Sequence, residues 1–321
     1  MGRVIVLGST ITDLVARAQR LPLPGEALLG DDFATYLGGK GFNQAVAAAR
    51  MGADVAFIGR VGVDAYGDAF AAALDQEGID RTYLTRDATT GTGTACVMIG
   101  TDRGQNAIIV LPQANLTLTV GMVEEVMQSM LKDVADQRTI FMAQCEMRLE
   151  TITAGLRCAR HAGMTTVLNA APAPRESFSP ELFALIDMLV VNESEAGTLA
   201  GLTVNTPDSA IEAASHLIAR GPAHVIVTLG EQGSIWSSRK TGGQELNHRW
   251  VPVIPVTQVD ATAAGDAFCG ALAAQLAQEL ATEEALHGAS VAGALAVTRR
   301  GAFPSLPTRE EVQAFLGSGS L

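Results

Sequence analysis

The feature that most constrains this chain is the alternation, between residues 120 and 229, of short apolar runs with segments of helical period. Short β-branched runs bounded by turn residues predict buried strands, and apolar residues that recur every three or four positions predict helices. Such alternation gives a mostly parallel sheet with helices on both faces. The predicted elements are a helix over residues 120–131, a strand over 139–143, a helix over 149–161, strands over 166–168 and 188–191, a helix over 207–220 and a strand over 224–229.

The N-terminal part begins with a predicted strand over residues 3–7, and an Ala-rich helix ending at Gly52 and a strand–helix unit ending at Gly78 come later. Two segments, at about residues 11–37 and 93–111, break this pattern. The first is rich in Pro and Gly with short runs such as residues 27–30, and the second has a hairpin signal at residues 101–104. We expect the two segments to form a small sheet that stands off the main body, within one domain over residues 1–321.

Composition excludes several classes of partner. The 321 residues have 22 Lys and Arg against 34 Asp and Glu, a formal net charge of −12, which argues against nucleic-acid and membrane partners. The N-terminus leads into a strand and no apolar run is long enough for a membrane span, so we expect a cytoplasmic protein. The cysteines lack metal-ligand spacing and are expected to be free thiols: Cys96, Cys145, Cys158 and Cys269.

We expect the chemistry at the turn that joins the apolar, β-branched run of residues 251–259 to a helix. Helical spacing is shown by Phe268, Leu272, Leu276 and Leu280. In Ala263-Ala264-Gly265-Asp266, small residues at a helix start let backbone N–H groups point at an anion. Asp266 adds a carboxylate that can take a proton from an alcohol attacking phosphorus. The simpler interpretation is that Asp266 only caps the helix.

A second motif, Gly-Gly-Lys-Gly-Phe-Asn at residues 38–43, precedes the Ala-rich helix. It lacks the Ser or Thr after Lys and the earlier Gly of a P-loop. Its glycines allow a ligand close to the backbone, with Lys40 and Asn43 as donors to hydroxyls. Taken alone, it is also an ordinary helix-entry loop.

Two further motifs follow predicted strands. Asn192 and Glu195 share one face of a helix start and can hold Mg²⁺ through water, although an N-cap with an acidic first turn explains them equally well. Thr228, Gly230 and Gly233 end another strand, where glycines can admit nucleotide phosphates; a plain turn is the alternative. All these motifs fall at carboxyl ends of strands, where open α/β sheets bind ligands.

In their order along the chain, these motifs resemble the signatures of the ribokinase-like (PfkB) family of ATP-dependent sugar kinases. The matching patterns are Gly-Gly-Lys-Gly-x-Asn at Gly38, Asn-x-x-Glu at Asn192, Thr-x-Gly-x-x-Gly at Thr228 and Asp-x-x-x-Ala-Gly-Asp at Asp260. The resemblance spans essentially the whole chain, residues 4–315, and is strongest to the ribokinase and deoxyribokinase branches. It implies a three-layer α/β/α sandwich with a mostly parallel central sheet and a small β-sheet lid that often pairs two subunits. The activity it implies is transfer of the γ-phosphoryl of ATP to the primary hydroxyl of a pentose, D-ribose in the first place.

The resemblance also implies roles for individual residues. The sugar-binding residues are Asp13, Gly39, Lys40, Asn43, Glu146 and Asp266. Catalysis is assigned to Asp266 with the N–H groups of Ala263, Ala264 and Gly265, and nucleotide binding to Asn192, Thr228, Gly230, Gly233 and Gly265. Mg²⁺ is expected at Asn192 and Glu195 through water, and K⁺, largely on carbonyl oxygens, at Asp260, Thr262, Ala296, Arg299, Gly301 and Ser305.

One departure from the family pattern concerns the sugar. Ribokinases have Asn two residues before the sugar-binding Asp, and this chain has Ile11 there. A buried hydroxyl without a partner loses roughly 1–3 kcal/mol, or about five- to a hundredfold in affinity. Deoxyribokinases have an apolar residue at this position, which makes 2-deoxy-D-ribose an alternative substrate unless Thr10 or Thr12 supplies the missing bond. Phe42, where ribokinases often have Ala, also changes the pocket.

Two functions of other classes stay open at this point. A non-catalytic sugar- or nucleotide-sensing protein could keep the fold, although the intact Gly265 and Asp266 argue against it. A dinucleotide-dependent oxidoreductase would fit the α/β pattern, but the chain lacks Gly-x-Gly-x-x-Gly after its first strand.

Overall fold

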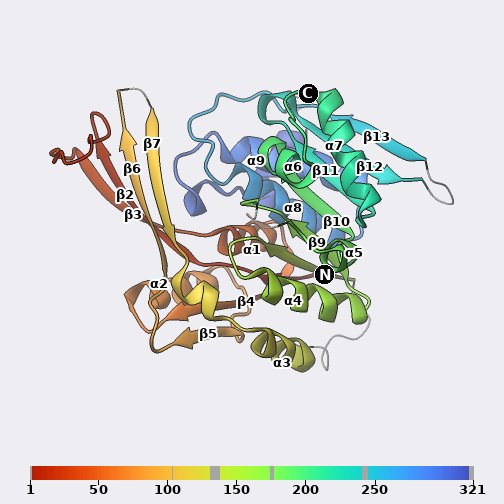
Figure 1. The fold of residues 1–321 in the computed structure, drawn as a ribbon, viewed down its shortest axis with the longest axis horizontal. Helices are drawn as coiled ribbons and strands as arrows, with labels where there is room; N and C mark the ends of the chain where they lie inside the picture. Colours follow the sequence, from red (N-terminus) through yellow and green to blue (C-terminus); the bar gives the residue numbers. More distant parts are fainter. Residues whose placement is uncertain (1, 103, 131–137, 174–176, 241–244, 318–321) are drawn as a thin grey trace.

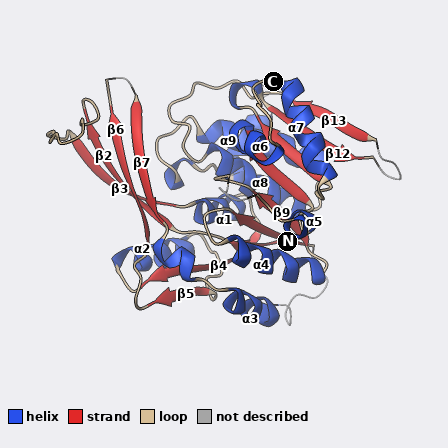
Figure 2. Cartoon of the chain, in the orientation of Figure 1, coloured by secondary structure: helices blue, strands red, loops and turns tan. Residues whose placement is uncertain are grey.

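The computed structural model describes residues 2–102, 104–130, 138–173, 177–240 and 245–317. Two sheets organise them, a nine-stranded sheet covered by helices and a four-stranded sheet that projects from one side (Figures 1 and 2). No helix in these ranges has the length and apolar character needed to cross a bilayer.

The nine-stranded sheet has the order β13-β12-β11-β10-β9-β8-β1-β4-β5. Neighbouring strands in this sheet are parallel, except that β12 runs antiparallel to both β11 and β13. The strands are β1 (Arg3–Leu7), β4 (Asp54–Gly62), β5 (Leu84–Asp87), β8 (Thr139–Gln144), β9 (Thr165–Asn169), β10 (Met188–Asn192), β11 (His224–Thr228), β12 (Ser234–Arg239) and β13 (Leu246–Val251).

Both faces of this sheet are buried, because alternate strand residues enter different cores. Val4 and Val6 of β1 pack into one cluster and Ile5 and Leu7 into the other. The first core includes α1 (Lys40–Arg50), α2 (Ala65–Gln76), α8 (Ala264–Ala277), α9 (Thr282–Ala296) and α10 (Arg309–Gly317). The second includes α3 (Val120–Met130), α4 (Leu149–His161), α5 (Pro180–Ala184), α6 (Glu193–Ala200) and α7 (Pro207–Ala219). The predicted three-layer α/β/α fold is confirmed.

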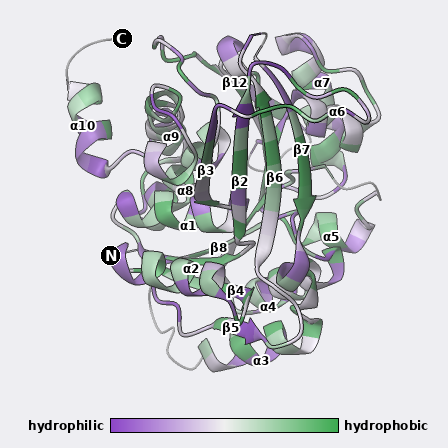
Figure 3. Ribbon diagram, turned by 90° about the vertical axis from the view of Figure 1, so that its left-hand side faces the viewer, coloured by the Kyte–Doolittle hydropathy of each residue, from purple (hydrophilic) through white to green (hydrophobic). Residues whose placement is uncertain are grey.

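The four-stranded sheet, called the small sheet below, has the order β3-β2-β6-β7 and stands in front of the core in Figure 3. Its strands are β2 (Ile11–Ala18), β3 (Asp32–Gly38), β6 (Gly93–Gly100) and β7 (Gln105–Leu111). The central pair, β2 and β6, is parallel, and each edge strand is antiparallel to its neighbour. The two segments that break the α/β pattern thus form one separate sheet, as expected.

Two expected strands are absent. Only Val251 of the run at residues 251–259 belongs to a strand, and residues 252–258 form a loop, so the turn before Asp266 follows a loop and not a strand. Pro252 and Pro255 explain this, since proline cannot donate to a ladder. Residues 27–30 are also a loop, in which Leu29 is 97% exposed and has no core to pack on.

Candidate active site

Polar residues gather at the carboxyl ends of neighbouring parallel strands. Asn169, Asn192 and Thr228 are the last residues of β9, β10 and β11, and Glu146 lies two residues beyond β8. Because these strands are parallel and adjacent, their ends meet at one edge of the sheet. The start of α8 and the small sheet face the same edge (Figure 1).

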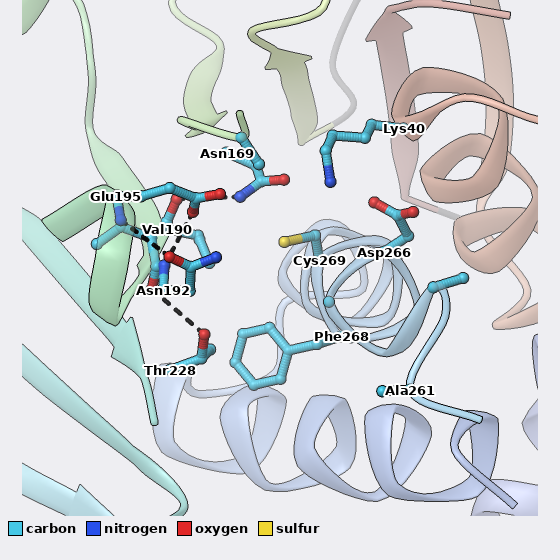
Figure 4. Close-up of a pocket in the computed structure, with 14 residues that line it drawn as sticks. Lys40, Asn169, Val190, Asn192, Glu195, Thr228, Ala261, Asp266, Phe268 and Cys269 are labelled. Carbon is cyan, nitrogen blue, oxygen red and sulfur yellow. Dashed lines mark hydrogen bonds between the residues drawn. The ribbon is translucent and has the colours of Figure 1, made fainter. Parts of the chain in front are cut away.

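Two cavities meet at this edge. The smaller, of about 210 Å³, is lined by Asn192, Glu195 and Thr228 on one side and by Lys40 and Asp266 on the other (Figure 4). The larger, of about 720 Å³, lies under the small sheet and reaches Glu146. Lys40, Ala263 and Asp266 line both cavities, so Asp266 stands where a ligand in one would meet a ligand in the other.

The start of α8 is shaped by a backbone conformation that the sequence did not reveal. Ala263 has φ 61°, in the left-handed region, which costs about 1–2 kcal/mol for a residue with a Cβ. The Ala264 N–H donates to the Ala261 carbonyl at 3.3 Å, and Ala264 lines neither cavity. Gly265 lines the smaller cavity, and a Cβ on it would have no atom within 4 Å. Of the predicted anion hole, Ala263 and Gly265 therefore face the cavity and Ala264 does not.

Asp266 is 6% exposed and is held through both carboxylate oxygens. Asn43 Nδ2 donates to Oδ2 and Gln44 Nε2 donates to Oδ1, each at 3.0 Å. Asn43 Oδ1 is buried and has no partner, while the residue lines the larger cavity. Asn43 was expected to donate to a sugar hydroxyl; its Nδ2 has a second hydrogen beyond the bond to Asp266, and its unpaired Oδ1 adds an acceptor.

Lys40, at the start of α1, lies among carboxylates. Burial lowers the pKa of Lys40, but the charges of Asp266, Glu146 and Glu195 outweigh it, so that the pKa is raised and the ammonium group stays charged. The Lys40 backbone N–H and the Ser9 hydroxyl both donate to Glu146 Oε2, at 2.8 and 2.5 Å. Burial raises the pKa of Glu146 despite these donors.

Gly39 allows the start of α1 to pack closely against β2. It has φ 91°, and a Cβ would lie 2.7 Å from the Ile11 backbone nitrogen. The close approach brings the start of α1 against the first residue of β2, so the segment at residues 38–43, the end of β3 and the first turn of α1, is both a helix entry and a cavity wall.

Ile11, which stands where the family pattern has Asn, is 3% exposed and lines the larger cavity together with Asp13 of the same strand. Burial and the charge of Glu146 raise the pKa of Asp13 to about 6. Thr10 and Thr12 line neither cavity, and their buried hydroxyl oxygens have no partner in the structure. Because successive strand residues point to opposite faces, Ile11 faces the cavity and its threonine neighbours do not.

Asn192 and Glu195 form a capping box at the start of α6. Asn192 Oδ1 accepts from the Glu195 N–H and Glu195 Oε2 accepts from the Asn192 N–H, both at 2.9 Å. Both also line the smaller cavity, and burial raises the pKa of Glu195. The structural role considered from sequence is therefore present, and the remaining oxygen lone pairs are available to a hydrated cation.

The three residues predicted to form a nucleotide loop differ in their positions relative to the cavities. Thr228 lines the smaller cavity, whereas Gly230 and Gly233 line neither cavity. Gly230 is exposed with φ 52°, and Gly233 has φ 83° with its position for a Cβ only 2.3 Å from the Val251 carbonyl oxygen. Gly233 thus lets η2 (Gly230–Gln232) pack against the end of β13.

The residues expected around K⁺ come from two segments that the structure joins. Asp260 Oδ1 accepts from the Thr262 N–H and hydroxyl, and its Oδ2 accepts from the Gly301 N–H at 3.0 Å. Arg299 pairs with Glu311, and the Ser305 hydroxyl donates to the Ala302 carbonyl. The Ala296 carbonyl accepts from the Arg299 N–H at 3.2 Å. Over the described part of the chain, no three His, Cys, Asp or Glu residues group as a metal site.

Three site residues escaped the sequence analysis: Ser9, Gln44 and Asn169. Ser9 follows β1 and binds Glu146, while Gln44 contacts Asp266 and Asn169. A polar residue directly after a strand, and a glutamine within an otherwise apolar helix face, were the signals available.

Comparisons with known proteins identify the family of this chain. The family model described as "pfkB family carbohydrate kinase" matches residues 1–309. A ribokinase from Haemophilus influenzae is 37% identical over 311 residues, covering 97% of each chain, and a deoxyribokinase from Salmonella typhi is 32% identical over 313 residues, covering 98% of each. A solved Arabidopsis thaliana ribokinase, complexed with ribose and ATP, superposes with a TM-score of 0.85 at 30% identity, covering 98% of each chain. The chain belongs to the pfkB family of carbohydrate kinases.

Proposed function

We propose that this protein is an ATP-dependent ribokinase, which transfers the γ-phosphoryl group of ATP to the primary hydroxyl of D-ribose. The observation that carries the proposal is the position of Asp266, a carboxylate held by two donors where the two cavities meet. The relatives named ribokinase, and the solved neighbour complexed with ribose and ATP, support the same substrates.

The larger cavity would hold the sugar. Asp13, Glu146 and Asn43 Oδ1 offer acceptors to sugar hydroxyls, and the Lys40 ammonium group offers donors. With these hydroxyls bound, the primary hydroxyl faces Asp266. The carboxylate accepts its proton while the oxygen attacks the γ-phosphorus and the bond to the β-phosphate oxygen breaks, giving ADP.

The smaller cavity would hold the phosphates of ATP. Lys40 stays charged there, and Ala263 and Gly265 line its floor at a helix start, where partial positive charge favours an anion. Asn192 and Glu195 fit a hydrated Mg²⁺, since both have oxygens at this cavity. Such an ion would reduce the repulsion between the phosphates and the surrounding carboxylates.

A second candidate substrate, 2-deoxy-D-ribose, is favoured by one observation. Ile11 faces the larger cavity, and Thr10 and Thr12, which could have replaced its missing amide, do not line it. A ribose hydroxyl placed against Ile11 would lack a side-chain partner there, whereas a sugar without that hydroxyl would not lose a bond.

The deciding experiment is an ADP-release assay with ATP, Mg²⁺ and K⁺ on D-ribose, 2-deoxy-D-ribose and a panel of other sugars and nucleosides. We expect the highest kcat/KM with D-ribose. A higher value with 2-deoxy-D-ribose would assign the second candidate. Sugar binding by calorimetry without ADP release on any of them would instead support the non-catalytic sensor.

We further propose that residues 1–321 act as one kinase unit, with the small sheet as its lid and as the contact between two subunits. Phe33 and Ile109 are 65% and 61% exposed, and the register places both on the face of the small sheet opposite the cavity. Analytical ultracentrifugation tests the dimer. The proposal also includes a K⁺ ion bound near Asp260, which loss of activity on replacing K⁺ with Na⁺ would support. It further includes a cytoplasmic location.

A further inference from the structure

A hydrogen-bonded network of buried amide side chains holds Asp266 on the side away from the cavities. Gln44, which is completely buried, donates from Nε2 to Asp266 Oδ1 and to Asn169 Oδ1, each at 3.0 Å. Its Oε1 accepts from Gln144 Nε2 at 2.8 Å. Gln44 lines neither cavity, so it would touch neither substrate.

The orientation of each amide follows from one backbone carbonyl. A carbonyl only accepts, so Asn169 must turn Nδ2 toward the Val190 oxygen, 3.1 Å away, and present its Oδ1 to Gln44. Gln44 must then direct its amino group to Asn169 and Asp266, and its oxygen to Gln144. The opposite orientation would place a carbonyl oxygen against the Asp266 carboxylate, where two acceptors repel.

We propose that Gln44 is a positioning residue for phosphoryl transfer, an inference that rests on the proposed function. Asn43 holds one oxygen of Asp266 and Gln44 holds the other, so together they fix the plane of the carboxylate. Asn43 also lines the larger cavity and is available to the sugar, whereas Gln44 is committed to protein partners. Gln44 therefore keeps Asp266 aimed at the incoming hydroxyl before and after the sugar binds.

The test is Gln44→Met, which keeps the length of the side chain and removes its donors. Because a small misplacement of a reacting group lowers the rate steeply, we expect kcat to fall about 10–100-fold while KM for ATP and for the sugar changes less than about twofold. Gln275→Met is the matched control. Gln275 is another buried glutamine, on α8, whose Nε2 donates to the Ala271 carbonyl, and its loss should lower stability but leave kcat unchanged.

A double-mutant cycle separates positioning from packing. In an Asp266→Asn background, Gln44→Met should lower kcat by less than about twofold, because the group it positions is already lost. An equal fold-loss in both backgrounds, or a kcat within about twofold of the unchanged protein after Gln44→Met alone, would overturn the proposal.

A second variant covers the possibility that Gln44→Met does not fold. Gln144→Met removes the donor that fixes Gln44 and should lower kcat about three- to tenfold, again only when Asp266 is present. The same two criteria then decide. A protein that releases no ADP with any sugar contradicts the proposed function, whereas an active protein that is indifferent to both variants contradicts only the role of Gln44.

Discussion

The two cavities are built from different parts of the molecule. The smaller is lined mainly by residues at the carboxyl ends of the nine-stranded sheet and at the start of α8, all set on the two packed cores. The larger takes much of its lining from the small sheet, through alternate residues of β2, β6 and β7. Under the proposed function, the core would carry out phosphoryl transfer and the small sheet would contribute the residues that distinguish one sugar from another, so we expect that each property can be altered without the other.

Asp266→Asn is expected to have the largest effect. The amide cannot accept the proton, so kcat should fall about 10²–10⁴-fold or more, while nucleotide binding and the ratio of rates on D-ribose and 2-deoxy-D-ribose stay unchanged. Steady-state kinetics and nucleotide titration measure these quantities. Near-normal turnover would remove Asp266 from its role, and a changed sugar ratio would break the separation between the cavities.

Ile11→Asn tests the other half of the comparison. A side chain that can bond the extra hydroxyl should raise kcat/KM for D-ribose relative to 2-deoxy-D-ribose about five- to a hundredfold, with little change in kcat. Thr12→Val is the matched control, since Thr12 is buried beside Ile11 but lies off the cavity, and its ratio should not move. A ratio that is equally unaffected in both variants would show that Ile11 does not select the sugar.

The pH dependence of sugar binding should show the raised pKa of Asp13. The carboxylate accepts hydroxyl hydrogens through both oxygens, and with charge assistance, only when it is ionised, which holds above its pKa of about 6. Below that pH the group is protonated, and KM for the sugar should rise about tenfold per pH unit, while KM for ATP stays level. In Asp13→Asn this rise should disappear; a rise that persists would point to Glu146, whose pKa is also raised.

Substitutions of Asn192 should have the smallest effect. Its two proposed roles, capping α6 and offering an oxygen to hydrated Mg²⁺, can be tested separately. Asn192→Ala removes the cap of α6, which should lower stability by about 1 kcal/mol and weaken the response to Mg²⁺. Asn192→Asp keeps an accepting oxygen for the Glu195 N–H and should retain both. Thermal unfolding and Mg²⁺ titration distinguish the two variants. A normal Mg²⁺ response in Asn192→Ala would limit this residue to capping.

The sequence predicted the parts of the fold that depend on local pattern. The helix over residues 149–161 was predicted with the bounds of α4, because its apolar period is a local signal. The strand predicted over residues 251–259 was wrong, because the β-branched residues of this run favour a strand but its prolines exclude one. The β12–β13 hairpin was not anticipated, since residues 246–251 are mostly polar or large and lie at a sheet edge.

The candidate site was predictable where a motif exists, and not where the site depends on long-range contacts. Asp266, Lys40 and Asn43 belong to recognisable motifs and do line the cavities. Gln44 contacts Asp266, Asn169 and Gln144, which all lie far from it in sequence, so no local pattern reveals these contacts. The left-handed conformation of Ala263 is likewise set by its surroundings, because alanine has no local preference for it.

The parallel pairing of β2 with β6 bears on how the protein folds. Ile11 pairs with Gly93, and β4, α2 and β5 of the core lie between these two strands in the chain. The β6–β7 hairpin can form locally, but the β2–β6 ladder that joins the two halves of the small sheet closes only after the intervening core segment has brought these two strands together. The complete small sheet is thus expected to be the last part of the molecule to acquire native structure, and its formation reports that the core beneath it is complete.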